Sequence, residues 1–93
     1  MKRKSFAKAR DANELEIVNA LESIGATVQR LDFVDLLVGY KGGTSLMEVK
    51  NPLVDWKVEK AQRDLVEEWK GSPIYFVTNP DAAINIAKRN AVR

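Results

Sequence analysis

Residues 34–50 read VDLLVGYKGGTSLMEVK, and this stretch decides the fold. Two runs rich in apolar and β-branched residues, 34–40 and 44–50, lie on either side of a Gly42-Gly43 pair. Such runs separated by two glycines are typical of a β-hairpin with a two-residue turn. We therefore expect two adjacent antiparallel strands that are joined at these glycines.

The register of this hairpin determines which charged side chains meet. With the two-residue turn, Lys41 pairs with Thr44, and Asp35 then stands opposite Lys50. Glu48 and Lys50 share a face in any register, because alternate residues of a strand point to the same side. The two-residue turn adds Asp35 to that face, whereas a three-residue turn would place it on the other face.

The flanking sequence predicts one domain of the α/β (α+β) class, with a central mixed sheet flanked by helices. A chain of 93 residues is sufficient for a single domain with a thin core. Residues 1–10 are interpreted as a basic arm and residues 11–93 as the folded domain. The expected order α-β-β-β-α-β-α consists of a helix at 11–24, strands at 26–31, 34–40 and 44–50, a helix at 57–70, a strand at 74–78 and a helix at 80–89.

The first helix carries an acid on its apolar stripe. Asp11 is expected as its N-cap with Glu14 three positions later, as in a capping box, and Gly25 is expected at its C-terminal end. Glu14 is spaced to lie on the same side as the inward-facing Ile17 and Leu21. Two interpretations stay open: Glu14 meets solvent at the helix end, or it serves a functional site.

The chain contains no histidine and no cysteine. These absences exclude a Ser-His-Asp triad, histidine-dependent metalloproteases and nucleases, disulfides and thiolate zinc sites. No apolar run is long enough to span a membrane, and the basic start lacks the apolar region of a signal peptide. We therefore expect a cytoplasmic protein.

The charged face of the hairpin predicts a metal site. Two carboxylates at about 4 Å repel by roughly 4 kcal/mol in an effective dielectric of about 20, and Lys50 alone does not cancel that repulsion between Asp35 and Glu48. Because only oxygen ligands are present, the expected ion is Mg²⁺, with Mn²⁺ as a substitute. A water held by such an ion beside Lys50 could attack a phosphodiester.

Other polar and aromatic positions have competing interpretations. Gln62 shares the inward stripe of the second helix, where it is either a hydrogen-bonded core residue or part of the site. Trp56 and Trp69 are expected to pack rather than to stack on bases. The arm carries five basic residues and no acid, which suits phosphate contacts or simple solubility; these are Lys2, Arg3, Lys4, Lys8 and Arg10.

Taken together, Asp35 and the Glu48-Val49-Lys50 tripeptide resemble the motif of the PD-(D/E)xK nuclease superfamily. With Glu14 and Gln62 in their contexts, the chain from about residue 10 to residue 87 is similar to small phage and bacterial proteins of its VRR-NUC and Holliday-junction-resolvase-like branch. Val34 stands where the proline of the family motif would be.

The resemblance implies a restriction-endonuclease-like core and a role for each matching residue. Asp35 and Glu48 would bind the metal together with the Val49 carbonyl, and Glu14 would complete its outer shell. Lys50 would activate water or stabilise the transition state, and Gln62 would support the site. Members of this branch are commonly homodimers that act on branched DNA.

The sequence therefore leads to a metal-dependent endodeoxyribonuclease, structure-selective and similar to Holliday junction resolvases, as the first hypothesis. A non-catalytic nucleic-acid-binding or assembly subunit with the same fold is the alternative. A toxin-like or restriction-type nuclease with a preferred sequence is a third possibility.

Overall fold

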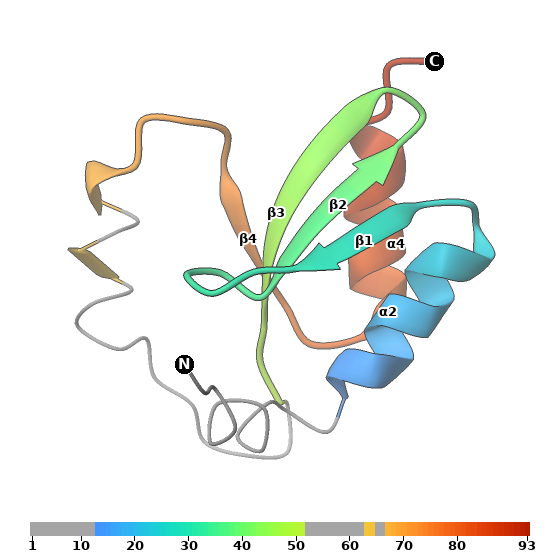
Figure 1. Cartoon of the computed structure of the whole chain (residues 1–93), viewed down its shortest axis with the longest axis horizontal. Helices are drawn as coiled ribbons and strands as arrows, with labels where there is room; N and C mark the ends of the chain where they lie inside the picture. Colours follow the sequence, from blue (N-terminus) through green and yellow to red (C-terminus); the bar gives the residue numbers. More distant parts are fainter. Residues whose placement is uncertain (1–12, 52–62, 65–66) are drawn as a thin grey trace.

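The computed structural model of the chain describes residues 13–51, 63–64 and 67–93. These residues form an α+β fold with one four-stranded sheet, drawn in Figure 1. In chain order the elements are α2 (Glu14–Ser23), β1 (Thr27–Arg30), β2 (Leu36–Tyr40), β3 (Gly43–Val49), β4 (Ile74–Val77) and α4 (Pro80–Arg89).

The sheet is mixed, as expected. Its strands lie in the order β1-β2-β3-β4; β1, β2 and β3 are antiparallel neighbours, whereas β4 runs parallel to β3. A parallel neighbour requires a long crossover, and the connection from Val49 to Ile74 supplies it. The predicted helix at 57–70 belongs to this connection. Residues 63–64 and 67–68 are helical, Trp69 and Lys70 are not, and the rest of that prediction falls outside the described residues.

Both described helices cover the same face of the sheet (Figure 1), and the core lies between them and the strands. The small Ala83 and Ala87 of α4 are fully buried, which lets that helix approach the sheet closely. The larger core side chains are Ile17 and Leu21 from α2 and Leu36, Val38, Met47, Val49 and Val77 from the strands. The described part of the crossover lies on the other side of the sheet, where Trp69 contacts Phe33 at a ring-centroid distance of 5.9 Å.

The hairpin turn lies one residue earlier than the sequence suggested. Lys41 and Gly42 form it, with φ angles of 46° and 81°, and Tyr40 pairs with Gly43. Positive φ at both positions is the type I′ geometry that suits the twist of a hairpin. The expected pairing of Lys41 with Thr44 was therefore wrong by two positions in register. An even shift preserves the faces, so Glu48, Lys50 and the residue at 35 still belong to one side.

The start of α2 also differs from the expected capping box. Its N-cap is Asn13 and its first residue is Glu14, so Glu14 does not occupy the third helical position. Asp11 falls outside the described residues. The other end agrees with the sequence: Gly25 has a φ of 96°, and the bonds from Gly25 N–H to Glu22 and from Ala26 N–H to Leu21 form a Schellman motif.

The bounds of α4 agree with the predicted helix at 80–89. Asn79 is the N-cap, its side chain accepts a 2.8 Å bond from Ala82 N–H, and Pro80 is the first residue of the helix. Among the residues with described structure, no helix combines the length and the apolar character that crossing a bilayer requires.

Gly43 and Gly39 make a matched pair for testing how tightly α4 meets the hairpin. A Cβ on Gly43 would collide with the carbonyl oxygen of Asn90, whereas one on Gly39 would meet nothing within 4 Å. We expect Gly43→Ala to lower the free energy of unfolding by about 1–3 kcal/mol through overpacking. Gly39→Ala should raise it by about 0.5 kcal/mol, because alanine loses less backbone entropy in a strand. Urea denaturation of both variants tests this, and equal effects would contradict the close contact.

Candidate functional site

The C-terminal end of β3 carries a buried pair of opposite charges. Glu48 is only 7% exposed, and its Oε2 lies 3.5 Å from the Lys50 Nζ. Counted over the side-chain atoms alone, the exposed fractions are 9% for Glu48 and 12% for Lys50, so both side chains are largely withdrawn from water. The two residues are neighbours on one face of the strand, because they are separated by a single residue. Charged groups in such a place are costly unless they are paired.

Asp35 joins this pair from the neighbouring strand. It directly precedes β2, and its Oδ2 accepts a 2.8 Å hydrogen bond from the Val49 backbone N–H. The register, continued one position beyond Leu36 and Met47, sets Asp35 opposite Glu48 rather than opposite Lys50. The carboxylate of Asp35 therefore lies at the amide between Glu48 and Lys50.

The loop before β2 holds Asp35 in place. Leu31 N–H donates a 2.9 Å hydrogen bond to the Asp35 carbonyl, which closes the connection from β1 into a tight turn. Asp35 is thus fixed through its backbone on one side and through its carboxylate on the other.

Asn13 fixes the backbone of Lys50. The Lys50 N–H donates to the Val77 carbonyl at 2.8 Å, which extends the β3–β4 pairing past the end of the strand. The side-chain amide of Asn13 donates to the carbonyls of Lys50 and Thr78 at 3.0 and 2.9 Å. Within the part of the chain that the structure describes, its Oδ1 is buried without a hydrogen-bond partner.

Sequence reasoning missed Asn13. Its place just before a helix is typical of a capping residue, yet its side chain makes no capping bond. Its two acceptors are 37 and 65 positions away in the chain, so no local pattern points to them.

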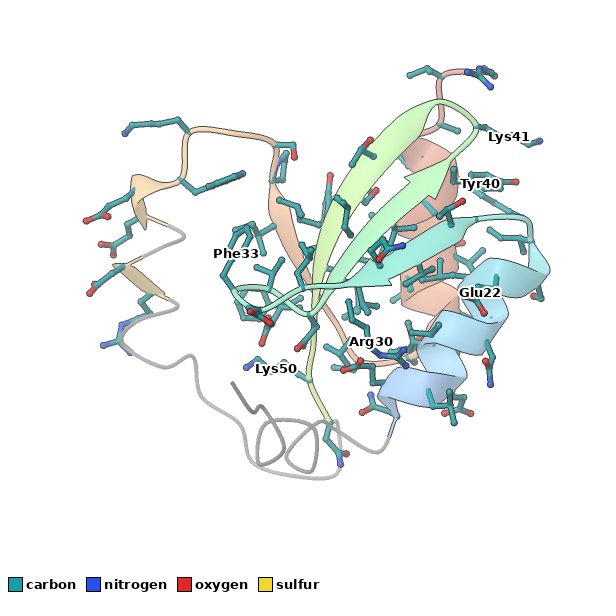
Figure 2. The ribbon with its side chains drawn as sticks, in the orientation of Figure 1. Glu22, Arg30, Phe33, Tyr40, Lys41 and Lys50 are labelled. Carbon is teal, nitrogen blue, oxygen red and sulfur yellow. The ribbon has the colours of Figure 1, made fainter. Side chains whose placement is uncertain are left out.

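Glu14 faces inward, as its spacing indicated. It is 2% exposed, so the alternative in which it meets solvent does not hold. Its Oε2 accepts a 2.8 Å hydrogen bond from the Nε of Arg30 on β1, and the two side chains form an ion pair. Arg30 and Lys50 lie at the same end of the sheet in Figure 2.

The predicted metal-binding carboxylates do not gather into one group of three. Among residues 13–51, 63–64 and 67–93, no cluster of three or more acidic side chains is close enough to hold an ion. By the register Asp35 and Glu48 are cross-strand neighbours at the tip of β3, whereas the carboxylate of Glu14 contacts Arg30. Val49, the predicted carbonyl ligand, lies at the same tip.

Several predicted site residues fall outside the described residues. They are Gln62 and the basic arm residues Lys2, Arg3, Lys4, Lys8 and Arg10. Trp56 is also outside. Trp69 behaves as a packing residue, because its ring contacts Phe33 and its indole N–H donates to the Ser72 carbonyl at 2.7 Å.

Comparison with known proteins gives no match: no protein-family model, no curated protein and no solved structure matches this chain. The candidate site is therefore described by its own residues and distances.

Asn13 offers a test of how the site is anchored. We expect Asn13→Ala to lower the free energy of unfolding by about 2 kcal/mol, because two carbonyls lose their donor at a partly buried position. Asn19→Ala on the exposed side of α2 should change it by less than about 0.5 kcal/mol. Chemical denaturation measures both variants. If Asn13→Ala and Asn19→Ala had the same free energy of unfolding, the hydrogen bonds of Asn13 to the Lys50 and Thr78 carbonyls would contribute nothing to stability.

Proposed function

We propose that the chain is a Mg²⁺-dependent endodeoxyribonuclease that hydrolyses phosphodiester bonds, with branched DNA as its preferred substrate. One observation carries the proposal: the Asp35 carboxylate accepts from Val49 N–H at 2.8 Å, between the buried Glu48 and its ion-pair partner, the partly buried Lys50. This arrangement collects two anions and one cation at the end of a β-hairpin. It is consistent with the resemblance to PD-(D/E)xK nucleases, from which the homodimeric state is also inferred.

The charges at the tip of β3 fit a divalent cation. Asp35, Glu48 and Lys50 together carry a formal net charge of −1, and Glu48 and Lys50 are nearly excluded from water. A hard divalent ion would more than offset this excess, and Mg²⁺ prefers oxygen ligands while it keeps several waters. Asp35 and Glu48 would hold it, with the Val49 carbonyl as a further ligand. Such an ion supplies Lewis acidity toward phosphoryl oxygens and lowers the pKa of a bound water.

The protein's own contribution is the fixed position of Lys50. Its backbone is held on both sides, by the Val77 carbonyl and by the Asn13 amide. Its Nζ lies 5.8 Å from the centroid of the Phe76 ring, so the ammonium also has a fixed environment on β4. A preorganised ammonium is a donor for the oxygens of a phosphoryl group, on which negative charge develops in the transition state.

Glu14 and Arg30 have a positioning role in this proposal. Their 2.8 Å ion pair neutralises the Glu14 carboxylate and links the start of α2 to the edge strand β1. Because Asn13 directly precedes Glu14, the pair also helps to hold the Asn13 amide against the ends of β3 and β4.

A second function is favoured by one specific observation. The Glu48–Lys50 pair at 3.5 Å already neutralises both groups, as a purely structural ion pair would. On that interpretation the chain is a non-catalytic nucleic-acid-binding or assembly subunit with the same fold. The two functions differ in whether DNA is cut when metal is added.

Asp35→Asn and Lys50→Met test the proposed catalytic roles. Asparagine keeps an oxygen that can accept from Val49 N–H but removes the charge, and methionine keeps a long apolar side chain beside Phe76. We expect each variant to lower the single-turnover cleavage rate of DNA by at least about 100-fold, because each loses an electrostatic interaction with the reacting group. Circular dichroism should show an unchanged fold.

Matched controls are Asp81→Asn and Lys70→Met, which remove the same charges at exposed positions on α4 and in the crossover. These variants should cut at the rate of the unmodified chain. Full activity of either Asp35→Asn or Lys50→Met would reject the role assigned to that residue.

Removal of metal separates the two candidate functions. We expect EDTA to abolish cleavage of synthetic four-way junctions, and Mg²⁺ or Mn²⁺ to restore it. Junctions should be cut faster than linear duplexes of the same sequence, and gel electrophoresis of end-labelled strands measures both rates. Binding without any metal-dependent cleavage would support the non-catalytic subunit instead, and a preference for one linear sequence would support a restriction-type nuclease.

A further inference from the structure

The hairpin turn, the last turn of α4 and the C-terminal residue carry four basic side chains at the far end of the sheet. We call this set, Lys41, Lys88, Arg89 and Arg93, the basic tip; all four residues are exposed. The two segments that build it, residues 40–47 and 82–93, contain no acid. Figure 2 shows Lys41 at the opposite end of the sheet from Lys50.

Backbone contacts hold the basic tip together. Val92 N–H donates to the Lys41 carbonyl at 3.0 Å, and Ala91 N–H donates to the Lys88 carbonyl at 3.2 Å. Arg93 lies directly over the turn, because a Cβ on Gly42 would be 3.2 Å from its Nε. The cations at the hairpin and at the C-terminal residues therefore occupy one surface.

Lys41 has a backbone conformation that is unfavourable for a lysine. Its φ of 46° is in the left-handed region, which a lysine occupies at a cost of about 1–2 kcal/mol and which asparagine or glycine tolerates better. A strained residue that carries an exposed charge points to a use for that charge.

Local interactions account for part of the basic tip. Lys88 and Arg89 lie in the last turn of α4, where cations interact favourably with the helix dipole. Arg89 also lies 5.6 Å from the Tyr75 ring, and the pKa of Tyr75 is lowered, first by the hydrogen bond with Asn90 and then by that with Arg89. Lys41 has a contact of its own, because its Nζ lies 5.5 Å from the centroid of the Tyr40 ring. None of these effects involves Arg93.

We propose that the basic tip binds the phosphate backbone of duplex DNA. It is a binding surface separate from the tip of β3, since Gly43 and Glu48 are five strand residues or about 17 Å apart. A duplex that contacts both the basic tip and the tip of β3 extends over at least about five base pairs, at about 3.4 Å per pair. The choice of DNA as the partner rests on the proposed function. The expectation that the partner carries several phosphates rests on the four cations alone.

The test compares Lys41→Asn/Arg93→Gln with the charge-preserving Lys41→Arg/Arg93→Lys. Fluorescence anisotropy with a labelled duplex in EDTA measures the dissociation constant at several salt concentrations. We expect the neutral double variant to bind about tenfold more weakly and to lose about two units of slope of log K against log salt. The charge-preserving variant and the exposed control Lys70→Gln should bind normally.

Folding does not confound this test. Lys41→Asn places a residue that tolerates positive φ in the turn, so the denaturation midpoint of that single variant should rise while its affinity falls. Unchanged affinity and an unchanged salt slope in the neutral double variant would overturn the proposal. The proposal would also be overturned if the neutral double variant lost binding to anionic lipid vesicles but kept its affinity for DNA. In that case the basic tip would bind a membrane surface instead.

The outcome is independent of catalysis. Because binding is measured in EDTA, the affinity of the basic tip is determined whether or not Mg²⁺ activates cleavage. A chain that binds through the basic tip and never cuts would refute the nuclease proposal and leave this one standing.

Discussion

The backbone amide of Val49 has a side chain as its acceptor, and the rest of the candidate site depends on this bond. Where β2 and β3 reach the end of their pairing, the Asp35 carboxylate takes the place of a strand carbonyl at 2.8 Å. A hydrogen bond to a charged group is stronger than one between neutral groups. It also brings a negative charge to Val49, whose two neighbours in the chain, Glu48 and Lys50, are charged and largely withdrawn from water.

Burial makes this combination specific. Glu48 is buried and both Asp35 and Lys50 are partly buried, so each charged group needs its partners to offset its removal from water. The start of α2 supports that geometry from the other side, through the Asn13 amide on the Lys50 carbonyl and the Glu14–Arg30 pair beside it. Two neighbouring residues of one helix therefore stabilise the ends of three different strands.

Local chemistry in the sequence was enough to predict the features that depend on near neighbours. The Schellman end of α2 at Gly25 and the Asn79-Pro80 start of α4 follow from the preferences of single residues. The inward position of Glu14 and the common face of Glu48 and Lys50 follow from helix and strand periodicity. The mixed four-stranded sheet follows from the order of the elements.

The misplaced turn has a tertiary cause. Gly42 and Gly43 look equivalent in the sequence, but only Gly42 is needed for the conformation of the turn. The carbonyl oxygen of Asn90 lies so close to Gly43 that it leaves no room for a Cβ there. The preferences of hairpin turns do not include such a contact. The bonds of Asn13 to Lys50 and Thr78, and the choice of Arg30 as the partner of Glu14, likewise join residues distant in the chain.

The parallel pairing of β4 with β3 has a consequence for the order in which the molecule assembles. The β1–β2–β3 meander consists of contacts between neighbours in the chain, so it can form early. The carbonyls of Val77 and Thr78 reach the end of β3 only after the whole crossover has been synthesised and its loop entropy overcome. A chain that folds in this order holds Asp35 against Val49 before the Val77 carbonyl accepts from Lys50 N–H, so β4 completes the surroundings of Lys50 last.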